Sequence, residues 1–172
     1  MKKERMNRLE KEIVERLEEA LKRGTSRSGD KIKNALCELG RKKGYGVYGH
    51  GTGRYQYHEF LWDLVWADTR EDDDVKKETG DEVVVKRLPM IAEIEMGTTK
   101  RHWLPDFEKL KFGVTGLRLF VCGVKNSDEK SVREAHEFCR KLSQMSKKTK
   151  SRYLLVMVPR NRDAIEYRFW VH

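Results

Sequence analysis

The chain has 172 residues, and its 37 lysines and arginines exceed its 28 aspartates and glutamates, giving a formal net charge of +9 at pH 7. A chain of this length can bury a substantial core, and no apolar run approaches the roughly 20 residues that a membrane-spanning helix needs. The three cysteines form no CxxC pair, so neither a zinc site nor a disulfide framework is indicated. The charged N-terminus contains no secretory signal. These features predict a reduced, cytoplasmic protein that contacts no membrane and binds a polyanion.

Hydrophobic periodicity predicts two amphipathic helices at the start of the chain. Apolar residues recur at three- and four-residue spacing between Met6 and Leu21, which predicts a helix over 3–23. Asp30 can cap a second helix over 31–43. The pattern then changes to strands, which are predicted at 45–50, at 55–68 after a Gly-rich turn, and within 83–96 after a polar hairpin or loop at 69–82.

The second half of the chain alternates helices with apolar strands. Pro105 can occupy the first turn of a short helix over 106–112, and Asp128 can cap a helix over 129–146. Strands are predicted at 117–124, 152–158 and 165–171. The resulting order, α-α-β-β-β-α-β-α-β-β, predicts a single α/β domain with helices on both faces of one mixed central β-sheet.

The predicted domain covers 1–172 and has three parts, namely an N-terminal amphipathic helix at 1–24, a core at 31–124, and a C-terminal helix with strands at 128–172. The apolar stripe of the N-terminal helix could pack on a second copy of the chain, forming a homodimer, or on its own sheet. The sequence leaves both arrangements open.

The charge is unevenly distributed along the chain. Residues 1–44 carry 14 basic and 8 acidic side chains, and residues 140–172 carry 9 and 2. Residues 59–95 reverse this balance, with 5 basic and 12 acidic side chains. Two basic flanks therefore enclose an acidic middle, which predicts a site with acidic residues at its base and basic residues around it.

Carboxylates interrupt two apolar strands in this acidic middle. Asp63 lies within Phe-Leu-Trp-Asp-Leu-Val-Trp, and Glu93 and Glu95 share one face of Met-Ile-Ala-Glu-Ile-Glu-Met. Buried carboxylates are costly unless they are paired, and a divalent cation relieves their mutual repulsion. Oxygen ligands favour Mg²⁺ or Mn²⁺. A sheet with one solvent-exposed face, or an Asp paired with an Arg, would give the same sequence pattern. For either strand taken alone, that simpler interpretation is favoured.

Together these features resemble the PD-(D/E)xK nuclease superfamily, the restriction endonuclease-like fold, whose core order is α-β-β-β-α-β. Residues 31–124 supply this order, with Asp63 and Glu93 at the positions of the metal-binding Asp and Glu. Glu38 matches the acid that many members carry on the preceding helix. Glu95 stands in place of the usual lysine, as in a Glu-x-Glu variant, and Lys109 lies on the helix to which other members move that lysine.

The resemblance implies an endonuclease that uses Mg²⁺ or Mn²⁺ to hydrolyse phosphodiester bonds, with DNA as the substrate. Asp63 and Glu93 would hold the metal with the main-chain carbonyl of Ile94. Glu95 would orient a water or bind a second metal, and Lys109 would stabilise charge on the phosphate. Because Glu95 replaces lysine, a catalytically inactive module that binds nucleic acid or a protein partner is the alternative. A structural protein with paired acids, and RNA as its partner, is a third reading.

Two groups of basic residues are candidates for contacts with the nucleic-acid backbone. Lys100 and Arg101 directly follow the Glu-x-Glu strand, and Lys147, Lys148 and Lys150 form a basic run before the strand at 152–158. A solvated loop in the first case, and an ordinary polar connection in the second, explain the same residues without a ligand.

Overall fold

The computed structural model of the chain describes residues 5–22, 29–49, 61–71, 73–79, 83–145, 152–160 and 164–171. Its helices are α1 (Arg8–Lys22), α2 (Gly29–Lys42), α3 (Asp73–Thr79), α4 (Lys100–Leu110) and α5 (Glu129–Gln144). Its strands are β1 (Gly46–Tyr48), β2 (Leu64–Glu71), β3 (Val83–Glu95), β4 (Leu117–Val124), β5 (Arg152–Pro159) and β6 (Glu166–Val171). No helix in these ranges is long and apolar enough to cross a membrane.

The six strands form one mixed sheet in which spatial order follows chain order, from β1 to β6. The pairs β1–β2, β2–β3 and β5–β6 are antiparallel, whereas β3–β4 and β4–β5 are parallel. The two parallel pairs require crossover connections, and α4 and α5 provide them. The predicted α/β class with a single mixed sheet and flanking helices is therefore confirmed.

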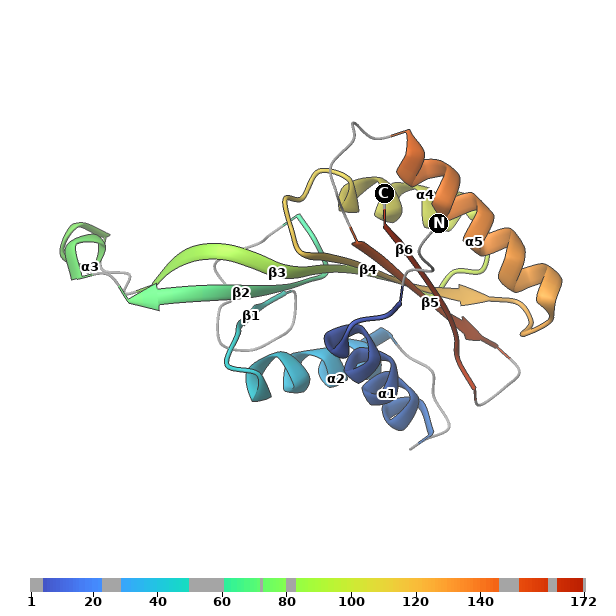
Figure 1. The fold of residues 1–172 in the computed structure, drawn as a ribbon, viewed down its shortest axis with the longest axis horizontal. Coiled ribbons are helices and arrows are strands. Elements are labelled where there is room, and N and C mark those ends of the chain that lie inside the picture. Colours follow the sequence, from blue (N-terminus) through green and yellow to red (C-terminus); the bar gives the residue numbers. More distant parts are fainter. Residues whose placement is uncertain are drawn as a thin grey trace.

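Helices cover both faces of the sheet (Figure 1). The helices α1 and α2 pack on one face, against a hydrophobic cluster that includes Trp66, Leu119 and Val156. The helices α4 and α5 pack on the other face, against a cluster that includes Ile91, Phe120 and Leu155. The strands at the centre are buried on both sides, which explains why β4 is apolar at every position except Arg118.

A partly buried ion pair ties α1 to the start of β5. Glu10 is 0% exposed, and Arg152 at the start of β5 donates to both of its carboxylate oxygens, at 2.7 and 2.9 Å. Asn7 and Glu10 also exchange hydrogen bonds between backbone and side chain, as in a helix capping box. The apolar side chains of α1 pack within the chain itself, so packing on its own domain is the arrangement observed.

The strand predicted over 55–68 begins only at Leu64, so Asp63 lies in a bend directly before it, and residues 50–60 lie outside the described residues. Two helices also differ from the sequence-based expectation. The helix α4 begins at Lys100, so Pro105 lies inside it rather than in its first turn. Buried Trp103 fixes the early start, because its indole N–H donates to the carbonyl of Gly97, 2.6 Å away. The second difference is α3, a short helix inside the polar segment that was predicted as a hairpin or loop.

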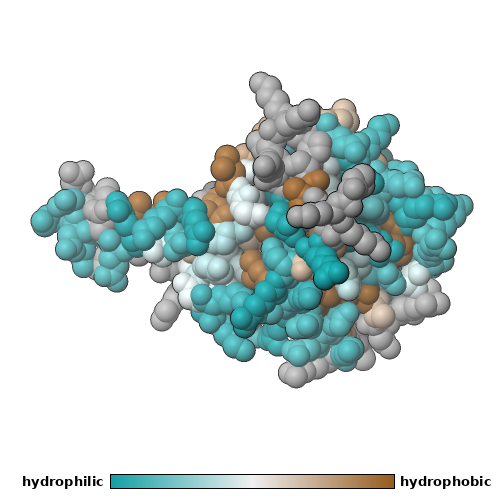
Figure 2. All heavy atoms as spheres, in the orientation of Figure 1, coloured by the Kyte–Doolittle hydropathy of each residue, from teal (hydrophilic) through white to brown (hydrophobic). Residues whose placement is uncertain are grey.

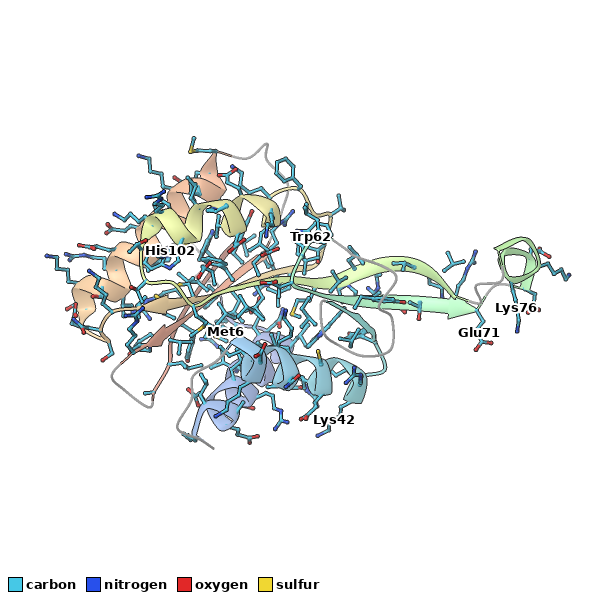
Figure 3. The ribbon with its side chains drawn as sticks, turned by 180° about the vertical axis from the view of Figure 1, so that it is seen from behind. Met6, Lys42, Trp62, Glu71, Lys76 and His102 are labelled. Carbon is cyan, nitrogen blue, oxygen red and sulfur yellow. The ribbon has the colours of Figure 1, made fainter. Side chains whose placement is uncertain are left out.

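The strands β2 and β3 continue beyond the helices as a two-stranded arm, with α3 at its tip (Figures 1 and 3). We define the arm as the described residues of 68–87. Two register shifts separate the arm from the body, between Trp66 and Asp68 and between Asp68 and Thr69. An ion pair between Arg87 and Asp68, at 2.9 Å, joins the two strands at this point.

Candidate active site

The carboxylates of β2 and β3 meet where β2 begins. Leu64 pairs with Ala92 across the two strands, which places the preceding residue, Asp63, beside Glu93. The backbone N–H of Ile94 donates to Asp63 Oδ2 at 2.9 Å, and Lys33 of α2 places its ammonium 3.8 Å from Oδ1. Asp63 is thus held between β3 and α2, with its charge close to Glu93.

Glu93 is the most deeply buried acid of this group. It is 0% exposed, and its Oε1 has no hydrogen-bond partner among the described residues, whereas Oε2 accepts from Lys109 at 3.3 Å. Burial and, to a lesser extent, the charge of Asp63 raise the pKa of Glu93 against the opposing effect of Lys109, and the net pKa is about 8. In this environment the carboxyl group is mostly protonated at pH 7. A buried carboxyl oxygen without a partner calls for a physical explanation.

Lys109 on α4 completes the cluster. Its ammonium lies 2.7 Å from Asp106 Oδ1, one turn earlier on the same helix, and 3.3 Å from Glu93 Oε2. Burial lowers the pKa of Lys109, but its contacts with Asp106 and Glu93 outweigh that effect and the net shift is upward. The side chain remains 37% exposed. The ammonium is therefore charged and reachable from solvent.

Trp62 connects the carboxylates to α4. Its indole N–H donates to the main-chain carbonyl of Lys109 at 2.9 Å, and its ring lies against Gly113. Because Trp62 directly precedes Asp63, this contact fixes the start of β2 relative to the end of α4. Gly49, directly after β1, packs closely against the backbone of Asp63, with its Cα against the Asp63 carbonyl.

Replacing Gly49 by alanine is expected to destabilise the protein by about 1–3 kcal/mol. The added Cβ would overlap the main-chain oxygen of Asp63, and neither backbone can swing away as a flexible side chain could. Gly29→Ala is the matched control, because its Cβ would lie 3.5 Å from Ile94 Cγ2, at ordinary contact distance. Urea denaturation of both variants tests this expectation, and equal stabilities would show that β1 does not approach Asp63 as described.

The other predicted acids have different surroundings. Glu95 lies two residues beyond Glu93, and its carboxylate accepts from the backbone N–H of Gly97. Glu38 faces the helix α1, where it forms an ion pair with Arg16. The described part of the chain contains no group of three or more His, Cys, Asp or Glu side chains arranged to hold a metal ion. The expected convergence of Asp63, Glu93 and Glu95 is therefore reduced to the pair Asp63 and Glu93.

The predicted phosphate-binding residues are only partly described. Lys100 and Arg101 lie in the first turn of α4 rather than in a loop, and both are exposed. The Lys100 ammonium lies 5.9 Å from the centre of the Phe138 ring. Lys147, Lys148 and Lys150 lie outside the described residues.

Three residues of the cluster were not identified as site residues from the sequence. Asp106 was expected only to begin a helix, and Lys33 was one of many lysines on a polar helix face. The spacing of Asp106 and Lys109, three residues apart on a helix, was the signal for their ion pair. Trp62 belongs to the apolar stretch around Asp63, and nothing in its spacing indicated a hydrogen bond to α4.

Comparison with known proteins identifies no relative, because no family model, curated protein or solved structure matches the chain. What the site can do is therefore argued from its own geometry.

Proposed function

We propose that the protein is a metal-dependent nuclease that hydrolyses phosphodiester bonds in DNA, with Asp63, Glu93 and Lys109 at its active site. The observation that supports this most is the buried Glu93 carboxyl group, which has an unpartnered oxygen beside a second carboxylate and a lysine. If the Glu93 carboxyl group bound no ligand, the fold would be more stable with a hydrogen-bond donor at its free oxygen or with an apolar residue in its place. The order of α2, β1–β3, α4 and β4, interrupted among the described elements by α3, also agrees with the resemblance.

The residues present fit a divalent cation. Mg²⁺ is commonly bound through one or two carboxylates, with waters and substrate phosphate as the other ligands. Asp63 and Glu93 supply two carboxylates at the ends of adjacent strands, and Glu93 Oε1 is free to act as a ligand. When bound, the cation would act as a Lewis acid on the phosphate and lower the pKa of a water molecule.

The side chains around the carboxylates have complementary roles. Lys109 would pair with a phosphate oxygen and stabilise the negative charge that develops there, while Asp106 holds the ammonium in place. The Ile94 N–H and the nearby Lys33 ammonium fix the orientation of the Asp63 carboxylate. The whole chain has a net charge of +9, and its basic flanks would attract the backbone of the nucleic acid.

The test is a cleavage assay on supercoiled plasmid and on single-stranded circular DNA, with Mg²⁺, Mn²⁺ or EDTA. We expect metal-dependent nicking by the wild type, no detectable nicking by Asp63→Asn or Glu93→Gln, and a loss of roughly 100- to 1,000-fold in Lys109→Met. Glu137→Gln and Lys86→Met, at exposed positions on α5 and in the arm, are the matched controls and should remain active.

A second measurement does not depend on activity. Because a ligand that binds only the folded state raises the melting temperature, Mn²⁺ should stabilise the wild type and Glu137→Gln but not Glu93→Gln. Nicking that survives both Asp63→Asn and Glu93→Gln would contradict the site. Nucleic-acid binding without cleavage, and without stabilisation by Mn²⁺, would instead favour an inactive binding module.

A further inference from the structure

Two apolar side chains project into solvent from the turn between α4 and β4. Phe112 is 74% exposed and Val114 is 91% exposed. They lie on either side of Gly113, in a short connection that begins directly after α4. Figure 2 shows hydrophobic atoms projecting from the body above the root of the arm, where this connection runs in Figure 1.

A buried arginine holds this turn in place. Arg118 of β4 is only 3% exposed, and its guanidinium donates to the carbonyls of Leu110 and Gly113, on either side of Phe112. Thr115 adds a hydrogen bond from its hydroxyl to the carbonyl of Leu88, at 2.8 Å. Burying a guanidinium is costly unless it has partners. The turn is thus rigidly supported, although the side chains that it presents touch little of the protein.

The turn is continuous with the candidate active site. Lys109 lies three residues before Phe112, and Trp62 spans the gap, with its indole N–H on the Lys109 carbonyl and its ring against Gly113. The residue after Trp62 is Asp63. One indole ring therefore separates the site carboxylates from the exposed apolar turn, and a strand bound at Lys109 would pass close to it.

We propose that Phe112 and Val114 form a base-stacking site, at which an unpaired nucleobase of the substrate packs while an adjacent phosphate lies at Lys109. This inference rests on the proposed function and narrows its substrate class to single-stranded or locally unpaired nucleic acid. Stacking requires a base whose face is open, and base faces in an intact duplex are covered by their neighbours. An exposed aromatic ring on a rigid support loses little conformational freedom when a base stacks on it.

The test compares binding of two probes to the full-length protein in EDTA, so that no cleavage occurs. One probe is a single-stranded oligonucleotide that carries 2-aminopurine, and the other is the same strand annealed to its complement. Phe112→Ala should weaken binding of the single strand by roughly 10- to 100-fold, and binding of the duplex should change little. Phe112→Trp should retain the wild-type affinity and quench the 2-aminopurine fluorescence.

Met145→Ala is the matched control, because Met145 is an apolar residue with 70% exposure at the end of α5. Equal single-strand affinities for Phe112→Ala and Met145→Ala would overturn the proposal. So would a wild-type dimer in sedimentation that Phe112→Ala separates, since the turn would then be an interface between copies. The nuclease proposal is tested by a different readout, namely the loss of cleavage in Glu93→Gln. The effect of Phe112→Ala on single-strand binding should be the same in the wild type and in the Glu93→Gln background, so either proposal can fail without the other.

Discussion

Replacing Glu10 by alanine is expected to lower the free energy of unfolding by about 2–3 kcal/mol, because Arg152 loses two charge-assisted hydrogen bonds to a fully buried carboxylate. Glu10 is fully buried, and its two oxygens accept from Arg152 at 2.7 and 2.9 Å. The pair joins α1 to a strand more than 140 positions away in the chain. Arg152 keeps its hydrogen bond to the Arg5 carbonyl and its side chain is 31% exposed, so the loss stays below that expected for a fully buried pair.

Urea denaturation at pH 7, with Glu19→Ala as the control, measures this effect. Glu19 lies on the same helix and pairs with Arg16 at the surface, so its removal should cost less than about 0.5 kcal/mol. The double variant Glu10→Leu with Arg152→Leu should recover part of the loss, since both charges are then absent. A similar small effect for Glu10→Ala and Glu19→Ala would show that the pair is not buried in solution.

The metal-free protein is expected to lose stability as the pH rises from about 5 to 8, through the ionisation of Glu93. Its pKa is raised to about 8 in the folded protein, by burial and then by Asp63, against an ordinary value of 4.5. In this window the folded state retains a proton that the unfolded state has released. The free energy of unfolding therefore decreases with pH, by at most about 1.4 kcal/mol per pH unit, and the full contribution is present only below 4.5.

The glutamine variant isolates this contribution from other titrating groups. Glu93→Gln is neutral at every pH, so its stability relative to the wild type should increase steadily from pH 5 to pH 8 in EDTA. Glu137→Gln, an exposed position on α5, should follow the wild type throughout. Parallel curves for Glu93→Gln and the wild type would mean that the carboxyl group titrates normally and is solvated.

Much of the fold could be predicted from periodicity, because each sheet strand and each long helix carries its own pattern of burial. The strand β4 was recognisable as an apolar run, and Asp128 was recognisable as the cap of α5, where it accepts from the Ser131 N–H. The start of α4 was not predictable in this way. It depends on the contact of Trp103 with Gly97, which is a tertiary interaction, whereas Pro105 is a local signal that pointed to a later start.

The candidate site shows the same division between local and tertiary information. Carboxylates inside apolar strands indicated Asp63 and Glu93, and strand pairing brings them together. The helix position of Lys109 was also a local inference. Glu38 was assigned to the site only because the resembling family carries an acid on the corresponding helix. The sequence could not show that Arg16 of α1 would lie beside it. Glu95 has the right alternation, yet a nearby backbone N–H captures its carboxylate.

The arm and the carboxylates occupy opposite ends of the same two strands. Asp63 and Glu93 lie where β2 begins and β3 is about to end, whereas the arm is built from the end of β2 and the beginning of β3. The register shifts near Asp68 lie between them. An insertion, deletion or exchange of sequence in the arm would therefore change the reach of the molecule without altering the register that aligns the two acids. The length of the arm and the geometry of the two acids are therefore set by separate parts of the same strands.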